Sequence, residues 1–199
     1  EKISGGMVIV KRGQAGTLHR IKVREASHPI PDRYGWRAAK ELMTMAEMTK
    51  EGDIAFCANT GGSSALAPLP VPEISLGDKR RVTELLLRSG ATIREINAVR
   101  KHLSCIKGGR MALAIFPAEI INLTVSDVIE DPLDYITGPT VPDTSTFADA
   151  VLVLERYNLM ARSPRSIRNY LQKATPELET PKDFSGLPVH TFVLVKSAS

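Results

Sequence analysis

Cysteine and aromatic residues are scarce in this chain of 199 residues. The two cysteines, Cys57 and Cys105, lie in separate segments, without a CxxC spacing or a neighbouring set of metal-ligand residues. We therefore expect two buried, reduced thiols rather than a zinc site or a structural disulfide. Aromatic residues make up only 5% of the chain and are not interleaved with the basic clusters, which argues against a stacking surface for single-stranded nucleic acid.

Long hydrophobic runs are also missing. No stretch approaches the roughly 20 apolar residues that a membrane helix requires. No basic segment followed by an apolar one opens the chain, so we expect a cytoplasmic protein without a secretion signal. Residue 1 is Glu rather than Met, from which we expect a fragment. The formal net charge of +4 is mild and compatible with nucleic acid or small anions, so the placement of the charges matters more than their sum.

Short apolar runs alternate with patterns of helical period, which is typical of a layered α/β fold. With 43% hydrophobic residues, the chain can build one sizeable core, and we expect one domain. The run at 54–58 holds no charge, which indicates a buried central strand. Thr92 and Glu95 predict a capping box at a helix start. We predict strands at 7–11, 20–25, 54–58, 119–125 and 189–195, and helices at 33–50, 76–88, 92–106, 146–157 and 164–173.

A glycine loop follows the strand at 54–58. Paired glycines let backbone N–H groups approach an anion closely, and neighbouring hydroxyls add donors. A flexible turn is the alternative, because the loop matches neither the Walker A pattern nor the dinucleotide fingerprint. The candidate phosphate- or substrate-binding residues here are Thr60, Gly61, Gly62, Ser63 and Ser64.

A basic segment follows at 96–110. At about 100° per residue, its polar residues share a helix stripe about 80° wide, beside an apolar stripe that can pack on a sheet. A guanidinium grips a carboxylate or phosphate with two bonds, and an ammonium adds a compact charge. A solvated basic face is the alternative, and His102 lies off the stripe as a surface or packing residue. The stripe holds Asn97, Arg100, Ser104 and Lys107.

Two further loops carry polar side chains. Asp127 lies just beyond the strand at 119–125, with Asp131 nearby. Their carboxylates could hold a hydrated Mg²⁺, or one could deprotonate a hydroxyl, although Asp-Pro pairs also make ordinary turns. His28 lies in a Pro-rich loop and fits a loop-stabilising role better than a catalytic one.

Five segments in this order resemble the N-terminal domain of class II glycerate kinases, whose second domain is called MOFRL. The resemblance implies a three-layer Rossmann-like sandwich with a mostly parallel central sheet. It implies ATP-dependent phosphorylation of D-glycerate to 2-phosphoglycerate, a reaction of carbohydrate metabolism. It also implies that Mg²⁺ takes part and that the active site lies in a cleft between two domains. The segments are HPIPD at 28–32, TGGSSALAPLP at 60–70, INAVRKHLSCIKGGRMA at 96–112, VSDVIEDPLD at 125–134 and GPTVPD at 138–143.

By position in these motifs, the resemblance carries functional roles onto the chain. It implies that residues 1–199 form the N-terminal domain, truncated at both ends and without the MOFRL domain. The expected partners are glycerate, ATP and that second domain, with no nucleic acid or membrane, and a homodimer is left open. The family's polar helix corresponds to Asn97, Arg100, Lys101, Ser104 and Lys107, its glycine loop to Gly61, Gly62 and Ser64, and its Ser-Asp-Val motif to Asp127.

Catalysis is assigned to three of these residues. Arg100 and Lys107 would neutralise phosphate or carboxylate charge, and Asp127 would serve the metal, with Asp131, or the attacking hydroxyl. Ser63 and Glu130 stand where the family has glycine, which motivates an alternative: a non-catalytic binding module for a sugar acid or nucleotide. An oxidoreductase acting on hydroxypyruvate is a weaker alternative, because no GxGxxG follows a predicted strand.

Overall fold

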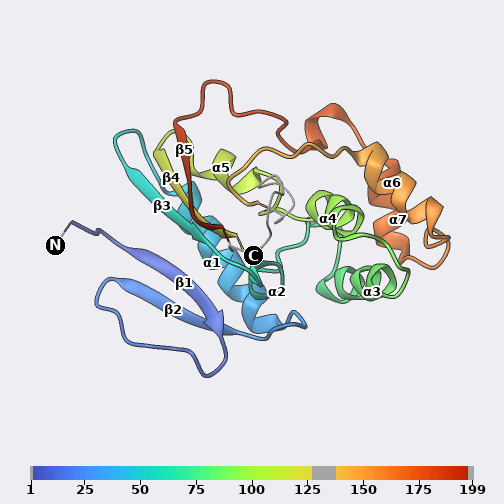
Figure 1. The fold of residues 1–199 in the computed structure, drawn as a ribbon, viewed down its shortest axis with the longest axis horizontal. Coiled ribbons are helices and arrows are strands. Elements are labelled where there is room, and N and C mark those ends of the chain that lie inside the picture. The colour runs from blue at the N-terminus through green and yellow to red at the C-terminus, as the bar shows by residue number, and fades with distance from the viewer. Residues whose placement is uncertain (1, 127–137, 197–199) are drawn as a thin grey trace.

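A computed structural model describes residues 2–126 and 138–196 of the chain (Figure 1). The strands are β1 (Gly6–Lys11), β2 (Ile21–Ala26), β3 (Ile54–Asn59), β4 (Glu119–Ser126) and β5 (Val189–Lys196). The helices are α1 (Arg33–Glu47), α2 (Ser63–Leu66), α3 (Leu76–Leu87), α4 (Ile93–His102), α5 (Arg110–Ile115), α6 (Phe147–Arg156) and α7 (Arg165–Gln172), with a 3₁₀ turn at Pro176–Leu178. Two strands open the chain, four helices lie between β3 and β4, and two more helices separate β4 from the last strand.

The strands form two parallel sheets, one of β1 and β2 and one in the order β3-β4-β5 (Figure 1). The predicted α/β class with parallel strands is confirmed, although the described strands are divided between two sheets. The prediction that residues 54–58 form a central strand is wrong for the sheet of described strands, because β4 is central there and β3 pairs with β4 alone among the described residues. An uncharged run indicates low polarity, but it does not predict whether the strand lies at the centre or at the edge of a sheet.

Helices α1 and α5 cover one face of the three-stranded sheet. Ala46 of α1 and Ile115 of α5 pack in one cluster with Cys57 of β3 and Ile120 of β4. Both cysteines are free, and Cys57 is buried as predicted, which raises the pKa of its thiol to about 11, whereas Cys105 is half-buried. The opposite face holds Phe56, which is 71% exposed.

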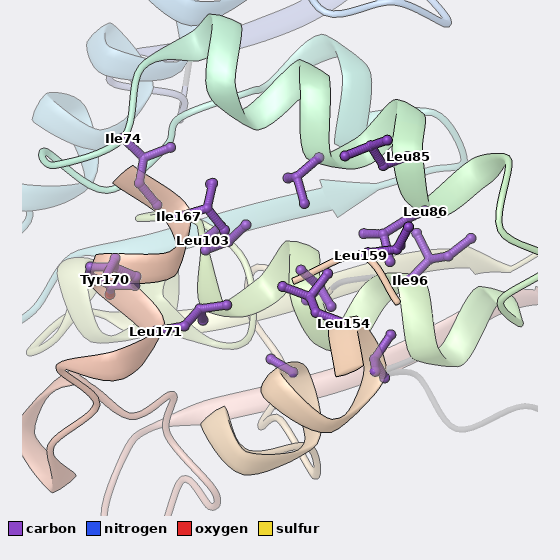
Figure 2. Close-up of a cluster of buried hydrophobic side chains, with 14 of the residues drawn as sticks. Ile74, Leu85, Leu86, Ile96, Leu103, Leu154, Leu159, Ile167, Tyr170 and Leu171 are labelled. Carbon is purple, nitrogen blue, oxygen red and sulfur yellow. The ribbon is translucent and has the colours of Figure 1, made fainter. Parts of the chain in front are cut away.

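The largest core lies among α3, α4, α6 and α7 (Figure 2), and these helices lie to one side of both sheets (Figure 1). Leu86, Val99 and Leu154 are fully buried there. Side-chain caps define where α3, α4 and α6 begin, and the predicted capping box of Thr92 and Glu95 is confirmed. No helix among the described residues is long and apolar enough to span a membrane.

Helix α4 ends at His102, so the predicted helix at 92–106 is wrong in its last turn. The Cys105 backbone N–H donates to the Leu69 carbonyl at 3.0 Å rather than to a carbonyl of α4, and Ser104 forms a β-bridge with Pro70. Pairing with the segment after the glycine loop therefore stops the helix. The short helices α2 and α5 were not predicted.

Candidate functional site

A buried polar network joins the strands of the larger sheet to the loop at 138–143. The Asn59 side chain donates to Asn122 Oδ1 at 2.9 Å and to Thr140 Oγ1 at 3.1 Å. Thr140 Oγ1 donates to the same Asn122 oxygen at 2.9 Å, and Asn122 Nδ2 donates to Thr191 Oγ1 at 3.3 Å. This network holds the 138–143 loop against the sheet near the carboxyl end of β3, where open α/β sheets bind ligands.

The glycine loop follows β3 directly and leads into the single turn of α2. Gly62 has a φ of +86°, and a Cβ there would lie 3.0 Å from His28 Nε2. The loop of His28 and the glycine loop are therefore in contact, and glycine is needed for both the backbone conformation and the space. Thr60 and Gly61 are exposed, and Ser63 and Ser64 are half-buried. Their predicted ligand contacts stay predictions.

Ser104 shapes the turn that follows α4. Its hydroxyl donates to the Leu69 carbonyl at 3.1 Å and accepts from the backbone N–H groups of Ile106 and Lys107, each at 3.3 Å. Ser104 is fully buried, and these three bonds use the donor and both acceptor positions of a hydroxyl. The Ser104 hydroxyl therefore holds in place the turn that carries Lys107. A contact between Ser104 and substrate stays a prediction.

The two glycines after Lys107 fit closely between neighbouring loops. Gly109 has a φ of +82°, and a Cβ there would lie 2.8 Å from the Pro181 ring. Its N–H donates to the Gly138 carbonyl at 2.9 Å. At Gly108, with a φ of +61°, a Cβ would lie 3.0 Å from Asp143 Oδ2. The Lys107 turn is thereby fixed against the loop at 138–143.

Lys101 and Asp143 form a buried ion pair with an Nζ–Oδ1 distance of 2.6 Å. Asp143 also accepts hydrogen bonds from the backbone and hydroxyl of Ser145 and from Thr180 Oγ1. Burial alone would raise the pKa of Asp143, but the charge and hydrogen bond of Lys101, with the Ser145 bonds, lower it overall. The pair locks α4 to the 138–143 loop, and the substrate contact predicted for Lys101 stays a prediction.

Three cations gather at the end of α4. Arg100 is half-buried and donates to Asn97 Oδ1 at 3.4 Å, while Lys107 is 3% exposed. Burial, followed by the positive charges of Arg100 and Lys79, lowers the pKa of Lys107 well below its usual range. Lys79 of α3 donates to the Leu103 carbonyl at 3.1 Å. These three residues, Lys79, Arg100 and Lys107, form what we call the basic cluster.

Lys79 was not predicted as a site residue, although the sequence carries a signal for it. Lys79 stands three residues before Val82 and seven before Leu86, so helical spacing places it on the buried face of α3. A lysine on an apolar face needs a partner or a function. Asp143 was also missed as the partner of Lys101, because nothing in the sequence pairs two residues so far apart.

The structure thus brings Asn97, Arg100 and Lys107 into one region, but from a helix and the turn after it rather than from one helix stripe. Whether Gly62 shares a ligand with them stays a prediction. The candidate metal ligands Asp127 and Asp131 lie outside the described residues. His102 is buried as a packing residue, with its Nδ1 2.7 Å from the Ala98 carbonyl and its ring 4.7 Å from that of Phe147.

Comparison with known proteins places this geometry in a family. Residues 1–172 match the family described as "Domain of unknown function (DUF4147)". A glycerate 2-kinase from Pyrococcus horikoshii is 42% identical over 98% of this chain and 45% of its own length. An Agrobacterium vitis relative with the provisional name hydroxypyruvate reductase is 42% identical over 89% of this chain and 40% of its own length.

Two solved structures share the fold. A crystal structure of a protein from P. horikoshii superposes with a TM-score of 0.91 at 43% identity, over 98% of this chain and 45% of that chain. A glycerate kinase from Thermotoga maritima superposes with a TM-score of 0.84 at 38% identity, over 95% of this chain and 44% of that chain. The chain thus spans less than half the length of these relatives. It belongs to the DUF4147 family and is similar to a part of these glycerate kinases.

Proposed function

We propose that this chain supplies one side of an active site that transfers the γ-phosphate of ATP to D-glycerate and forms 2-phosphoglycerate. The names of several relatives support a glycerate kinase activity, with ATP as the phosphate donor that such a name implies. The observation that carries the proposal is the basic cluster at the end of α4, on a turn that packs against the 138–143 loop, because both substrates are anions. We also propose that residues 1–199 act as the N-terminal domain of a longer kinase and that the site lies between two domains.

Phosphoryl transfer depends mainly on positioning and on stabilising the charge of the transferred group. Arg100 would hold a carboxylate or phosphate through its guanidinium, whose donors are only partly used by Asn97. Lys107 would add positive charge from a turn that Ser104 and Gly109 hold in place. Burial strengthens both interactions, because water screens less inside the protein.

Mg²⁺ remains a prediction. The carboxylates predicted to hold it, Asp127 and Asp131, lie outside the described residues. Within residues 2–126 and 138–196, no group of three or more His, Cys, Asp or Glu side chains is arranged to hold a metal ion. Where Mg²⁺ accompanies ATP, it neutralises phosphate charge, and the roles argued above for Arg100 and Lys107 concern the chain's own cations.

The test is Arg100→Ala in the full-length protein, assayed for phosphorylated glycerate in a coupled kinase assay. We expect kcat/KM to fall by about 10²–10³-fold, as for loss of a charge-stabilising donor. Arg80→Ala is the matched control, because Arg80 is exposed on α3 and should leave activity unchanged. Near wild-type kinetics for Arg100→Ala would remove the basic cluster from the active site. Calorimetric binding of ATP and glycerate without any product would instead favour the non-catalytic binding module.

A further inference from the structure

Lys79 is the least expected member of the basic cluster. It lies in the second turn of α3 on the face that packs against the core, and it is 6% exposed. Its Nζ lies at the end of α4, because the Leu103 carbonyl that it contacts belongs to the C-cap residue of that helix. Lys79 therefore reaches the same helix end as Arg100, but from a different helix.

The hydrogen bonds of Lys79 leave donors to spare. A lysine ammonium has three N–H donors, and among the described residues Lys79 donates to one acceptor, the Leu103 carbonyl. The other buried ammonium here, Lys101, has the carboxylate of Asp143 at 2.6 Å. No carboxylate in the described part of the chain pairs with Lys79 in this way. A buried ammonium with a neutral carbonyl as its acceptor is costly unless an anion joins it.

The charged neighbours of Lys79 increase the cost of burying its ammonium without a carboxylate partner. The electrostatic interactions that reach it come from Arg100 on α4, from Arg110 on α5 and from Lys107, all positive, and from the thiol of Cys105. Arg110 is already bound to the carbonyls of Lys101, Ser104 and Leu178. The cations with donors still available, Lys79 and Arg100, therefore flank the same end of α4.

We propose that Lys79 is an anion-binding residue of this site, which completes, with Arg100 and Lys107, a place for one carboxylate or phosphate group. The inference rests on the proposed function in one respect, the identity of the anion, which would be glycerate or a phosphate of ATP. It adds a residue from α3 to a site otherwise built from α4 and the turn after it.

The chemistry of Lys79 gives this inference a measurable signature. Burial, followed by the charge of Arg100, lowers the pKa of Lys79 to about 7, so much of it is neutral at pH 8 in the anion-free protein. An anion beside it favours the charged form and raises this pKa. Anion binding at pH 8 should therefore take up protons from the buffer, about one of them at Lys79 and any further proton at Lys107, and affinity should fall as the pH rises above 7.

The experiment is calorimetric titration of the chain at pH 8 with two probes that do not themselves titrate there, D-glycerate for the carboxylate and sodium sulfate as a phosphate-like anion. Each titration is repeated in buffers of different ionisation enthalpy, which yields the number of protons taken up. We expect proton uptake with the probe that the site prefers, and an affinity at least tenfold higher at pH 6.5 than at pH 9. The difference between the two arms shows which substrate group the site holds.

Three variants sharpen the result. Lys79→Met should weaken binding at least tenfold and reduce proton uptake by about one proton relative to the wild type. Lys79→Arg, which stays charged at every pH used, should take up about one proton fewer than the wild type and should lose less affinity at pH 9. Arg80→Met, exposed on the same helix, should behave as wild type. Circular dichroism confirms that each variant is folded.

Several outcomes would overturn the inference. They are wild-type binding without proton uptake, no binding of either probe by the folded wild type, and an uptake in Lys79→Met equal to that of the wild type. The wild-type measurement requires no variant to fold. The titrations measure binding, and the coupled kinase assay measures turnover separately. Glycerate phosphorylation without proton-linked binding would refute the role of Lys79 alone. Proton-linked binding without any product would refute the kinase proposal alone.

Discussion

The helices α3, α4, α6 and α7 and the sheet of β3, β4 and β5 bury their apolar side chains very differently. In the helical region, Leu86 and Leu154 are fully buried in one continuous core (Figure 2). In the sheet, Phe56 is 71% and Phe192 is 52% exposed, on strands that flank β4. Helices can enclose a core by packing on one another, whereas a parallel sheet normally needs cover on both faces.

The difference in burial indicates which part of the molecule holds the candidate site rigid. The basic cluster stands on the helical region, whose core fixes the relative positions of α3 and α4. The sheet contributes the Asn59–Asn122–Thr140 network and is covered on one face by described residues. Stability should therefore respond strongly to changes in the helical region and at its junction with the 138–143 loop, and weakly on the open sheet face.

The largest effect is expected at that junction. Asp143→Ala should lower the free energy of unfolding by about 3–5 kcal/mol, because it breaks a buried ion pair with Lys101. Urea denaturation followed by circular dichroism measures this change. The double variant Lys101→Met/Asp143→Leu should lose less, since no buried charge loses its partner. A loss below about 1 kcal/mol for Asp143→Ala would contradict a structural role for the pair.

Within the helical core, Leu154→Ala should lower the free energy of unfolding by about 2–5 kcal/mol through lost burial and a cavity. Leu152→Ala is the matched control, because Leu152 is 52% exposed on the same helix and should cost about 0.5 kcal/mol or less. Urea denaturation of both variants gives the comparison. Equal losses would mean that α6 packs differently from the arrangement described here.

The buried cation Lys79 should make stability depend on pH. Burial, with the charge of Arg100, lowers its pKa to about 7, whereas the unfolded chain keeps the usual value near 10.5. Between these values the unfolded state binds more protons, so the free energy of unfolding of the anion-free protein should rise with pH, by about 1 kcal/mol per unit between pH 7 and 9. Denaturation at several pH values measures the slope. Lys79→Met should flatten it, and an unchanged slope would assign it to other groups.

The smallest effect is expected on the open face of the sheet. Phe56→Ala should change the free energy of unfolding by about 0.5 kcal/mol or less, because the ring is largely exposed. Ile120→Ala, on the covered face of β4, should cost about 2–5 kcal/mol in the same assay. If Phe56→Ala proved as destabilising as Ile120→Ala, the open face would have to be covered in solution.

Local signals in the sequence predicted most of the elements. Apolar runs of strand length located all five strands, and helical periodicity located five of the helices. The Thr92 and Glu95 capping box was readable because both of its hydrogen bonds join residues three apart. The signals failed where a distant segment intervened, as at Cys105, whose N–H pairs with Leu69, and at β3, whose edge position depends on strand order.

The sequence by itself determined the α/β class, the caps and the residue types of the candidate site, because periodicity, turn chemistry and side-chain charge are properties of neighbouring residues. Only the tertiary structure decided that Ser104 supports a turn, that Asp143 neutralises Lys101 and that Lys79 joins Arg100 at the end of α4. Each of these depends on which segments meet in the folded chain. Burial then sets the energy of each charge interaction. Excluding water strengthens the attraction within an ion pair and raises the cost of a buried charge that has no partner.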